Sequence, residues 1–351
     1  MVDANVQIVR SGAAWSLGTK STEDSVYRAY LAAIADARYY IYIENQFFVT
    51  DTRDGCDGGQ VKNQIGEAIF QRIMRAHRNH EKFRVYVMMP LLPAFEGEIG
   101  TASGVAMQAV SHWNSVSISK GAESLLGRLS RYIEDPSEYI SFYGLRSWSK
   151  LVNGLTTELI YVHSKLLIID DMRTIIGSSN INDRSMTGER DSEVCAIITD
   201  IEVEPGMMNG LRTQSGRFSG SLRRYLMREH LGQLGNTLHG DGNSLDVSDP
   251  VCDQFYDGVW RRIARDNTQV YEKVFGCIPS DTVRNFVDVS LRVKQRNGGE
   301  FLEKSDTELA EKQLESVQGH LVEYPHNFLV DQNLTPRTGT KEALVPAFVW
   351  Q

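Results

Sequence analysis

One run of ten residues constrains the fold of this chain more than any other feature: Tyr161-Val-His-Ser-Lys-Leu-Leu-Ile-Ile-Asp170. Its length and its Val, Leu and Ile content predict a buried β-strand, in which alternate side chains face the same way. His163 and Lys165 would then share one face. An ammonium group withdrawn from water requires an anion, and an adjacent imidazole can act on that anion. The alternative is a satisfied core histidine beside a lysine whose charged end reaches solvent.

A second apolar run, residues 174–176, leads directly into Gly177-Ser-Ser-Asn180. Small and hydroxyl residues at a strand end offer donors to an oxyanion, so we expect Ser178, Ser179 and Asn180 to bind a phosphate group. The whole pattern, His-x-Lys-x4-Asp followed by Gly-Ser-x-Asn, resembles the signature of the phospholipase D superfamily at every fixed position. Within that signature, we expect Asp170 to anchor its strand rather than to carry a proton.

Helical and extended periodicities alternate along the N-terminal part of the chain. Helices are predicted over 23–37 and 62–79, with one or two more over 104–133 that break at Gly121. Strands are predicted over 38–44, 83–89, 139–144 and 191–198. This β-α-β progression predicts an α/β fold with a mixed, largely parallel sheet flanked by helices.

The sequence beyond residue 200 is less regular. We predict a basic helix over 211–231, which would be either a solvated face or a contact for anionic headgroups. A loop is predicted over 235–249, a helix near 251–266, and a loop or exposed helix over 294–312. We therefore divide the chain into a phospholipase D-type catalytic lobe, residues 1–232, and a C-terminal extension, residues 233–351, that packs on the lobe.

Polar residues at two predicted strand ends are further candidates for the site. Glu44, Asn45 and Gln46 end the strand 38–44, where α/β sheets gather their ligands, although turn formation also explains them. Asp191 and Glu193 share a face of a later strand, and either could accept the second ring N–H of His163. The superfamily tends to keep an acid about thirty residues past the histidine, so we favour Glu193.

Composition limits the classes of function. The net charge of −8 argues against a general nucleic-acid binder. The four cysteines lack metal-ligand or disulfide-framework spacing, so a reducing, cytoplasmic setting is expected. No run approaches about 18 apolar residues, so we expect membrane contact to be peripheral. An apolar loop over 90–99 either packs on its own domain or forms a lip that meets an apolar substrate.

The resemblance extends over nearly the whole chain, to the carboxy-terminal half of the animal phosphatidylcholine-hydrolysing phospholipases D. Members of that family carry two signatures in one polypeptide, behind lipid-binding PX and PH domains, and the site lies between the two halves. This chain has one signature, so it is expected to be a fragment of a longer product or to associate with a second chain. The segments that carry the resemblance are 43–48, 84–97, 158–165, 177–185, 190–193 and 345–350.

The resemblance implies hydrolysis of phosphatidylcholine through a phosphohistidine, or transfer of the phosphatidyl group to another alcohol, with no metal or other cofactor. One histidine attacks phosphorus and a second protonates the leaving alcohol, but the sequence leaves open which role His163 takes. Two alternatives remain. The chain could form a dimeric single-signature phosphodiesterase that acts on nucleic acid, against which its acidic balance argues, or it could be a non-catalytic fragment.

Overall fold

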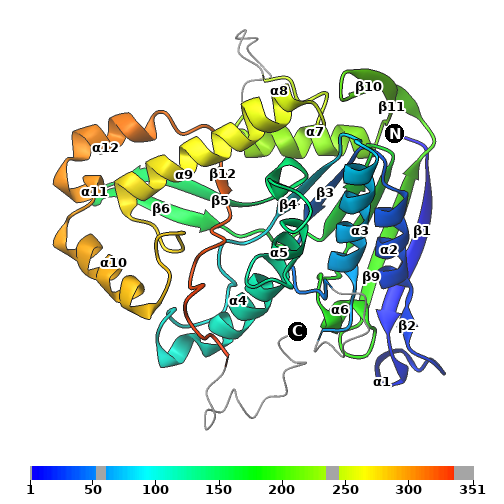
Figure 1. Cartoon of the computed structure of the whole chain (residues 1–351), viewed down its shortest axis with the longest axis horizontal. Coiled ribbons are helices and arrows are strands. Elements are labelled where there is room, and N and C mark those ends of the chain that lie inside the picture. The colour runs from blue at the N-terminus through cyan, green and yellow to red at the C-terminus, as the bar shows by residue number, and fades with distance from the viewer. Residues whose placement is uncertain (1, 53–60, 235–244, 336–351) are drawn as a thin grey trace.

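The computed structural model describes residues 2–52, 61–234 and 245–335, and a ten-stranded sheet forms its centre (Figure 1). Strand β6 (Gly154–Ile160) pairs with β5 outside the main order of the sheet. The other nine strands lie in the order β12 (Leu321–Glu323), β5 (Ile140–Leu151), β4 (Arg84–Met88), β3 (Tyr40–Glu44), β7 (Leu166–Ile169), β8 (Arg173–Gly177), β9 (Glu193–Asp200), β1 (Ala4–Gly12) and β2 (Glu23–Asp24).

The sheet is mixed, as predicted, but it is not largely parallel. Among the strands of the described residues, only the pairings of β3 with β4 and of β4 with β5 are parallel, and both are made through helical crossovers. Strands β7, β8 and β9 form antiparallel pairs. The turn between β7 and β8 spans only residues 170–172, which is too short for the crossover that a parallel pair requires. The α/β class and the helix-flanked mixed sheet are confirmed.

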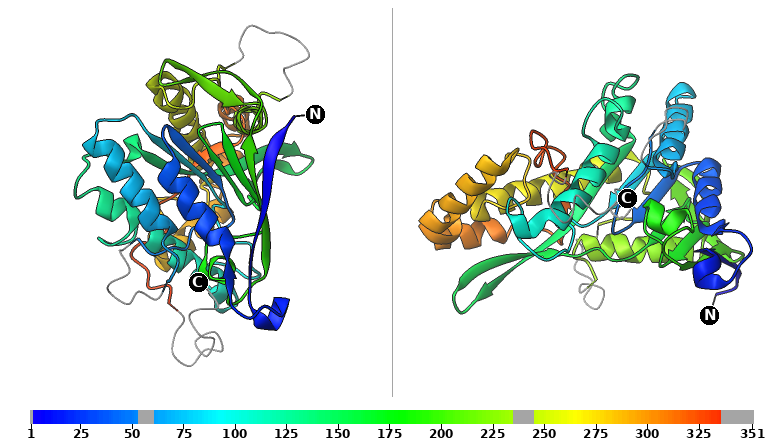
Figure 2. Two further views of the ribbon diagram at one scale, coloured as in Figure 1. Left: turned by 90° about the vertical axis from the view of Figure 1, so that its right-hand side faces the viewer. Right: turned by 90° about the horizontal axis from the view of Figure 1, so that it is seen from below.

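Helices cover both faces of the sheet (Figures 1 and 2). Strand β3 shows why, because Ile41 and Ile43 face one buried cluster and Tyr40 and Tyr42 face another. A strand that is apolar on both faces must lie between two layers. The first cluster is covered by α2 (Ser25–Asp36), α3 (Ile65–Arg78), α4 (Val105–Ile118) and α5 (Leu125–Leu129). The second is covered by α7 (Ser219–His230), α8 (Asp253–Phe255) and α9 (Arg262–Phe275), with a π-helical turn at Tyr256–Arg261.

The predicted helix over 211–231 is correct only in its second half. Strands β10 (Val203–Met208) and β11 (Leu211–Gly216) form a separate hairpin, and helix α7 begins at Ser219. The hairpin turn is Asn209-Gly210, and both residues have positive φ, 52° and 75°. Asn-Gly is the preferred dipeptide for a tight hairpin turn, so the sequence contained a signal against a continuous helix.

The other predicted helices agree with the structure. Helices α2 and α3 lie within the predicted ranges, and the helical region 104–133 divides into α4 and α5 around Gly121, whose φ is +90°. The predicted loop 235–249 falls partly, and the segment 345–350 wholly, outside the described residues. In the described part of the chain, no helix combines the length and the apolar character needed to cross a bilayer.

Elements of the C-terminal region contact the sheet. Strand β12 pairs with β5, and Trp260 is buried against tyrosines of β4 and β5. The proposed boundary at residue 232 remains a prediction. The remaining short or peripheral helices are α1 (Ala14–Leu17), α6 (Asp183–Met186), α10 (Phe286–Gly298), α11 (Leu302–Ser305) and α12 (Thr307–Leu314).

Candidate active site

The histidine and lysine of the signature lie on an irregular segment, residues 161–165, that leads into strand β7. The strand was predicted to begin at Tyr161 but begins at Leu166, which pairs with Glu44 at the end of β3. The ladder with β3 stops where β3 stops, although the carbonyl oxygen of Lys165 still accepts the backbone N–H of Gly177 on β8 at 3.2 Å. His163 is exposed and Lys165 is buried, and both precede the strand on which they were predicted to lie.

Lys165 is 8% exposed, yet its ammonium group contacts no carboxylate within 4.0 Å among the described residues. Its Nζ donates to Oε1 of Gln46 at 3.0 Å and to the carbonyl oxygen of His163 at 2.6 Å. Burial lowers the pKa of Lys165, and the charge of Glu193 partly offsets this effect. An enclosed ammonium that has only neutral acceptors is suited to bind an anion beside His163.

Asn45 and Gln46 hold this segment and the Gly177–Asn180 turn in place. Gln46 bridges the segment, because its Nε2 donates to the Tyr161 hydroxyl at 2.9 Å while its Oε1 accepts from Lys165. The side chain of Asn45 is 1% exposed; its Nδ2 donates to the Ser179 carbonyl at 3.3 Å and its Oδ1 accepts from the backbone N–H of Ile181 at 3.0 Å. The two amides thus join the two parts of the signature.

Glu44 forms a buried hydrogen-bonded group with residues that the sequence analysis did not select. Its Oε1 accepts from the Tyr42 hydroxyl at 2.6 Å and from Nε2 of His230 at 3.0 Å, and its Oε2 accepts from the Ser164 hydroxyl at 2.5 Å. Burial opposes ionisation of this carboxyl. The hydrogen bond and charge of His230, together with the Ser164 and Tyr42 hydroxyls, outweigh burial and lower the pKa of Glu44. The ionised carboxylate accepts all three bonds.

The Gly177–Asn180 turn packs tightly against strand β9. A side chain at Gly177 would collide with the backbone carbonyl of Val194, which explains why glycine occupies this position. The Ser178 hydroxyl donates to Oε2 of Glu193, and the fully buried Ser179 hydroxyl accepts from the Cys195 thiol at 3.3 Å. Oδ1 of Asn180 is buried without a hydrogen-bond partner among the described residues. The hydroxyls of Ser178 and Ser179 thus both form hydrogen bonds within the protein.

The two candidate partners of His163, Asp191 just before β9 and Glu193 at its start, are engaged elsewhere. Glu193 is 9% exposed; its Oε1 accepts from the Ser185 hydroxyl at 2.6 Å and its Oε2 from Ser178. Asp191 forms a two-bond pair with Arg184, at 2.9 and 2.8 Å. The ring of His163 stacks on Tyr161 with centroids 6.1 Å apart, and within the described chain no hydrogen bond links this ring to either acid. The choice of Glu193 over Asp191 remains a prediction.

Asp170 lies at the opposite end of β7 from Lys165 and binds backbone rather than substrate groups. Its two carboxylate oxygens accept the backbone N–H groups of Arg38 at 2.7 Å, Tyr39 at 2.7 Å and Tyr40 at 2.9 Å. Burial raises the pKa of Asp170, although these three N–H groups partly offset the effect. The contacts fit the predicted anchoring role, since they fix the start of β3 to the end of β7.

Four residues of the site were missed in the sequence, namely Tyr42, Ser164, Ser185 and His230. Ser164 lies between His163 and Lys165, so its position alone was a signal, whereas His230 belongs to a helix that was read as a solvated basic face. Its contact with Glu44 spans 186 residues of sequence and could not be inferred locally. Within the described residues, no three His, Cys, Asp or Glu side chains gather in an arrangement that could hold a metal ion.

Comparison with known proteins places this geometry in context. The family model described as Phospholipase D matches residues 2–158 and 145–252. Phospholipase D1 of Homo sapiens is 47% identical over 350 residues, which are 99% of this chain and 31% of the relative. Phospholipase D2 of Bos taurus is 43% identical over 99% of this chain and 36% of its own length, and Phospholipase D zeta 2 of Arabidopsis thaliana is 39% identical over 94% and 32%. The chain thus spans about a third of the length of these relatives.

Proposed function

Since the chain belongs to the phospholipase D family, we propose that it supplies one of the two half-sites of a phospholipase D. The observation that carries this proposal is the buried Lys165, which faces neutral acceptors beside the exposed His163. The proposed substrate is phosphatidylcholine, and the products are phosphatidate and choline. Transfer of the phosphatidyl group to another alcohol would use the same intermediate.

The proposed reaction proceeds by two displacements at phosphorus. One imidazole attacks phosphorus, the bond from phosphorus to the choline oxygen breaks, and a second imidazole gives its proton to that oxygen. Water then attacks phosphorus and the bond from phosphorus to the first imidazole breaks, while the second imidazole accepts a proton from the water. Lys165 and Asn180 would stabilise charge on the phosphoryl oxygens, with Ser178 and Ser179 contributing if their hydroxyls turn toward the substrate. Which of the two roles His163 takes stays open.

The proposal requires a partner and a membrane surface. A second imidazole must face the first across phosphorus, and this chain has one histidine in a complete His-x-Lys-x4-Asp signature, since His80 and Lys82 share only the His-x-Lys spacing. We propose that the partner is either the other signature-bearing half or a second copy of this chain. The assembly would act at the cytoplasmic surface of a membrane, to which it binds peripherally, because its substrate is a phospholipid.

Complementation tests the proposal. The purified chain is assayed on phosphatidylcholine vesicles while its mass in solution is measured, both alone and with a polypeptide that carries the other signature. We expect no turnover by the monomer and turnover after addition. Turnover only at concentrations where dimers form would favour a symmetric two-chain site. Steady turnover by a monomer would contradict the half-site proposal, and nuclease activity without lipase activity would contradict the substrate.

Variants of the signature supply the controls. In a competent assembly, we expect His163→Asn and Lys165→Arg each to reduce cleavage by at least ~10²-fold, the scale of losing a general acid or base. His80→Asn is the matched control, because His80 is exposed and lies outside the site. Full activity of a folded His163→Asn variant would remove the assignment of the site.

A further inference from the structure

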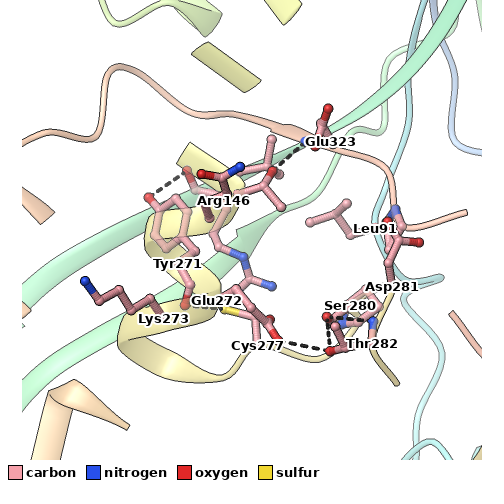
Figure 3. Close-up of a pocket in the computed structure, with 15 residues that line it drawn as sticks. Leu91, Arg146, Tyr271, Glu272, Lys273, Cys277, Ser280, Asp281, Thr282 and Glu323 are labelled. Carbon is pink, nitrogen blue, oxygen red and sulfur yellow. Dashed lines mark hydrogen bonds between the residues drawn. The ribbon is translucent and has the colours of Figure 1, made fainter. Parts of the chain in front are cut away.

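A cavity of about 350 Å³ lies apart from the signature residues, between helix α9, strand β12 and the loop 276–285 (Figure 3). Its walls include the buried side chains of Leu91, Tyr271, Cys277 and Val322. The hydroxyls of Ser280 and Thr282 also line it. Cavities of this size with mainly apolar walls and a few polar groups are typical of sites for small ligands.

Arg146 is the polar group that distinguishes this cavity. It is 5% exposed, and Figure 3 shows its guanidinium group directed into the space between Tyr271, Cys277 and Leu91. Its one side-chain hydrogen bond within the described chain runs from Nη1 to the Thr157 hydroxyl at 3.3 Å. Its guanidinium carbon lies 5.7 Å from the centroid of the Tyr271 ring, and within the described part no carboxylate lies within 4.0 Å of it.

The other buried arginines of the described chain are each paired with a carboxylate, although Nη1 of Arg72 is buried without a hydrogen-bond partner there. Arg72 binds the carbonyls of residues 37 and 38 and the carboxylate of residue 81. Arg84 binds two carbonyls and the carboxylate of Asp253, and Arg223 binds two carbonyls and both oxygens of Asp171. Each of these three has a carboxylate and at least two carbonyls as acceptors. Arg146 alone among the four has neither, and it faces a cavity.

From this difference we propose that the cavity binds a single-chain amphipathic carboxylate, such as a fatty acid, whose head group pairs with Arg146. A buried guanidinium is rarely left unpaired, and its planar fork matches a carboxylate with two parallel bonds. The apolar chain would lie against Leu91, Tyr271 and Val322. This site is independent of the proposed phospholipid chemistry.

The walls of the cavity also select for a single negative charge. Three carboxylates line it, those of Glu272, Asp281 and Glu323. Glu272 is paired with Arg292 at 2.5 Å, and a carboxylate oxygen of Asp281 accepts the backbone N–H of Asn327 at 2.6 Å. Like charges nearby oppose a dianion more strongly than a monoanion. A phosphate monoester is therefore expected to bind more weakly than a carboxylate of equal chain length, and the volume is too small for a two-chain lipid.

Calorimetric titration of the chain with sodium laurate, below its micelle concentration, tests the proposal. We expect one laurate per chain and an affinity that falls by about tenfold or more in Arg146→Met, which keeps an unbranched stem but removes the guanidinium group and its charge. Arg262→Met is the matched control, since Arg262 is exposed on helix α9, which borders the cavity, and pairs with Asp266. It should bind laurate as the parent chain does.

Two further comparisons keep the test decisive. Dodecyl phosphate should bind more weakly than laurate, and dodecyltrimethylammonium should not bind. If Arg146→Met does not fold, Thr282→Trp narrows the cavity from an exposed position and should weaken laurate in the same way. Failure of the parent chain to bind laurate would overturn the proposal. So would equal binding of laurate and the cationic amphiphile, or unchanged affinity in a folded Arg146→Met or Thr282→Trp variant.

Discussion

The Ser164 hydroxyl donates a hydrogen bond of 2.5 Å to Oε2 of Glu44, which joins the segment that carries His163 and Lys165 to the end of strand β3. The other carboxylate oxygen accepts from Nε2 of His230 at 3.0 Å. A carboxylate can only accept, so Nε2 carries a proton in this arrangement. The Glu44 carboxylate therefore links His230 of helix α7 to Ser164, which lies between His163 and Lys165. His230 acts on the site as a positioning residue.

Removing His230 should loosen that segment. In His230→Asn we expect faster hydrogen exchange of the amides in residues 161–165, because Glu44 loses one donor and holds Ser164 less firmly. In a competent assembly the value of kcat should fall about tenfold, with KM less affected, on the scale of one hydrogen bond to a charged group. His80→Asn serves again as the exposed control. Unchanged exchange in a folded His230→Asn variant would show that Glu44 positions Ser164 without it.

Replacing the acid on β9 should have a milder effect than replacing His163. Glu193→Gln keeps one acceptor oxygen for Ser185 or Ser178, so we expect a fall in kcat smaller than that of His163→Asn. Steady-state kinetics of the reconstituted assembly measure it. An unchanged rate would transfer the orienting role to Asp191, and Asp191→Asn is the variant to compare.

The role of Asp170 can be separated from catalysis by measuring stability. Asp170→Ala removes the acceptors of three backbone N–H groups and places alanine at φ +52°. We expect a loss of about 2–4 kcal/mol in the free energy of unfolding. Asp170→Asn should lose less, since asparagine keeps one acceptor and tolerates a left-handed backbone. Activity per folded molecule should be unchanged in both variants, and a stable but inactive Asp170→Asn would assign this residue to the chemistry.

Local patterns in the sequence predicted much of the fold and the members of the site. Apolar periodicity located helices α2 and α3 and strands β3 and β4, because each of these elements buries the apolar residues that recur along its own sequence. Spacing brought His163, Lys165 and the Gly177–Asn180 turn into one site, and Gln46 and Asn45 do join them. Glu44, Asn45 and Gln46 were candidates because they end a predicted strand, where α/β sheets gather their ligands.

Most of the errors arose where contacts between residues far apart in the sequence override the local pattern. The apolar run 161–170 was predicted as one strand, but β3 ends at Glu44, so the first half of the run is not paired with β3. The contact of Glu44 with His230 depends on helix α7, and the cavity that Arg146 faces is lined by residues of α9 and β12, which lie far from these two residues in the sequence. The helix predicted over 211–231 failed for a local reason, because Asn209-Gly210 is a turn signal that the basic pattern outweighed.

The stability of the fold should depend on pH through His326. Its Nδ1 is enclosed without a hydrogen-bond partner among the described residues, and its ring meets those of Phe142 and Tyr324 edge-on. Burial lowers the pKa of His326 from 6.5 to about 4. Between these values the unfolded chain binds a proton that the folded chain does not, so stability falls as the pH is lowered from about 6.5 toward 4.

At pH 5 the loss relative to pH 7 should reach up to about 2 kcal/mol, from ~1.36 kcal/mol per pKa unit. Urea unfolding of the parent chain and of His326→Phe at pH 7, 6 and 5 measures it. The variant should retain only a smaller slope, to which His112 contributes because burial also lowers its pKa. A slope in His326→Phe equal to that of the parent chain would show that His326 is accessible to protons in the folded protein.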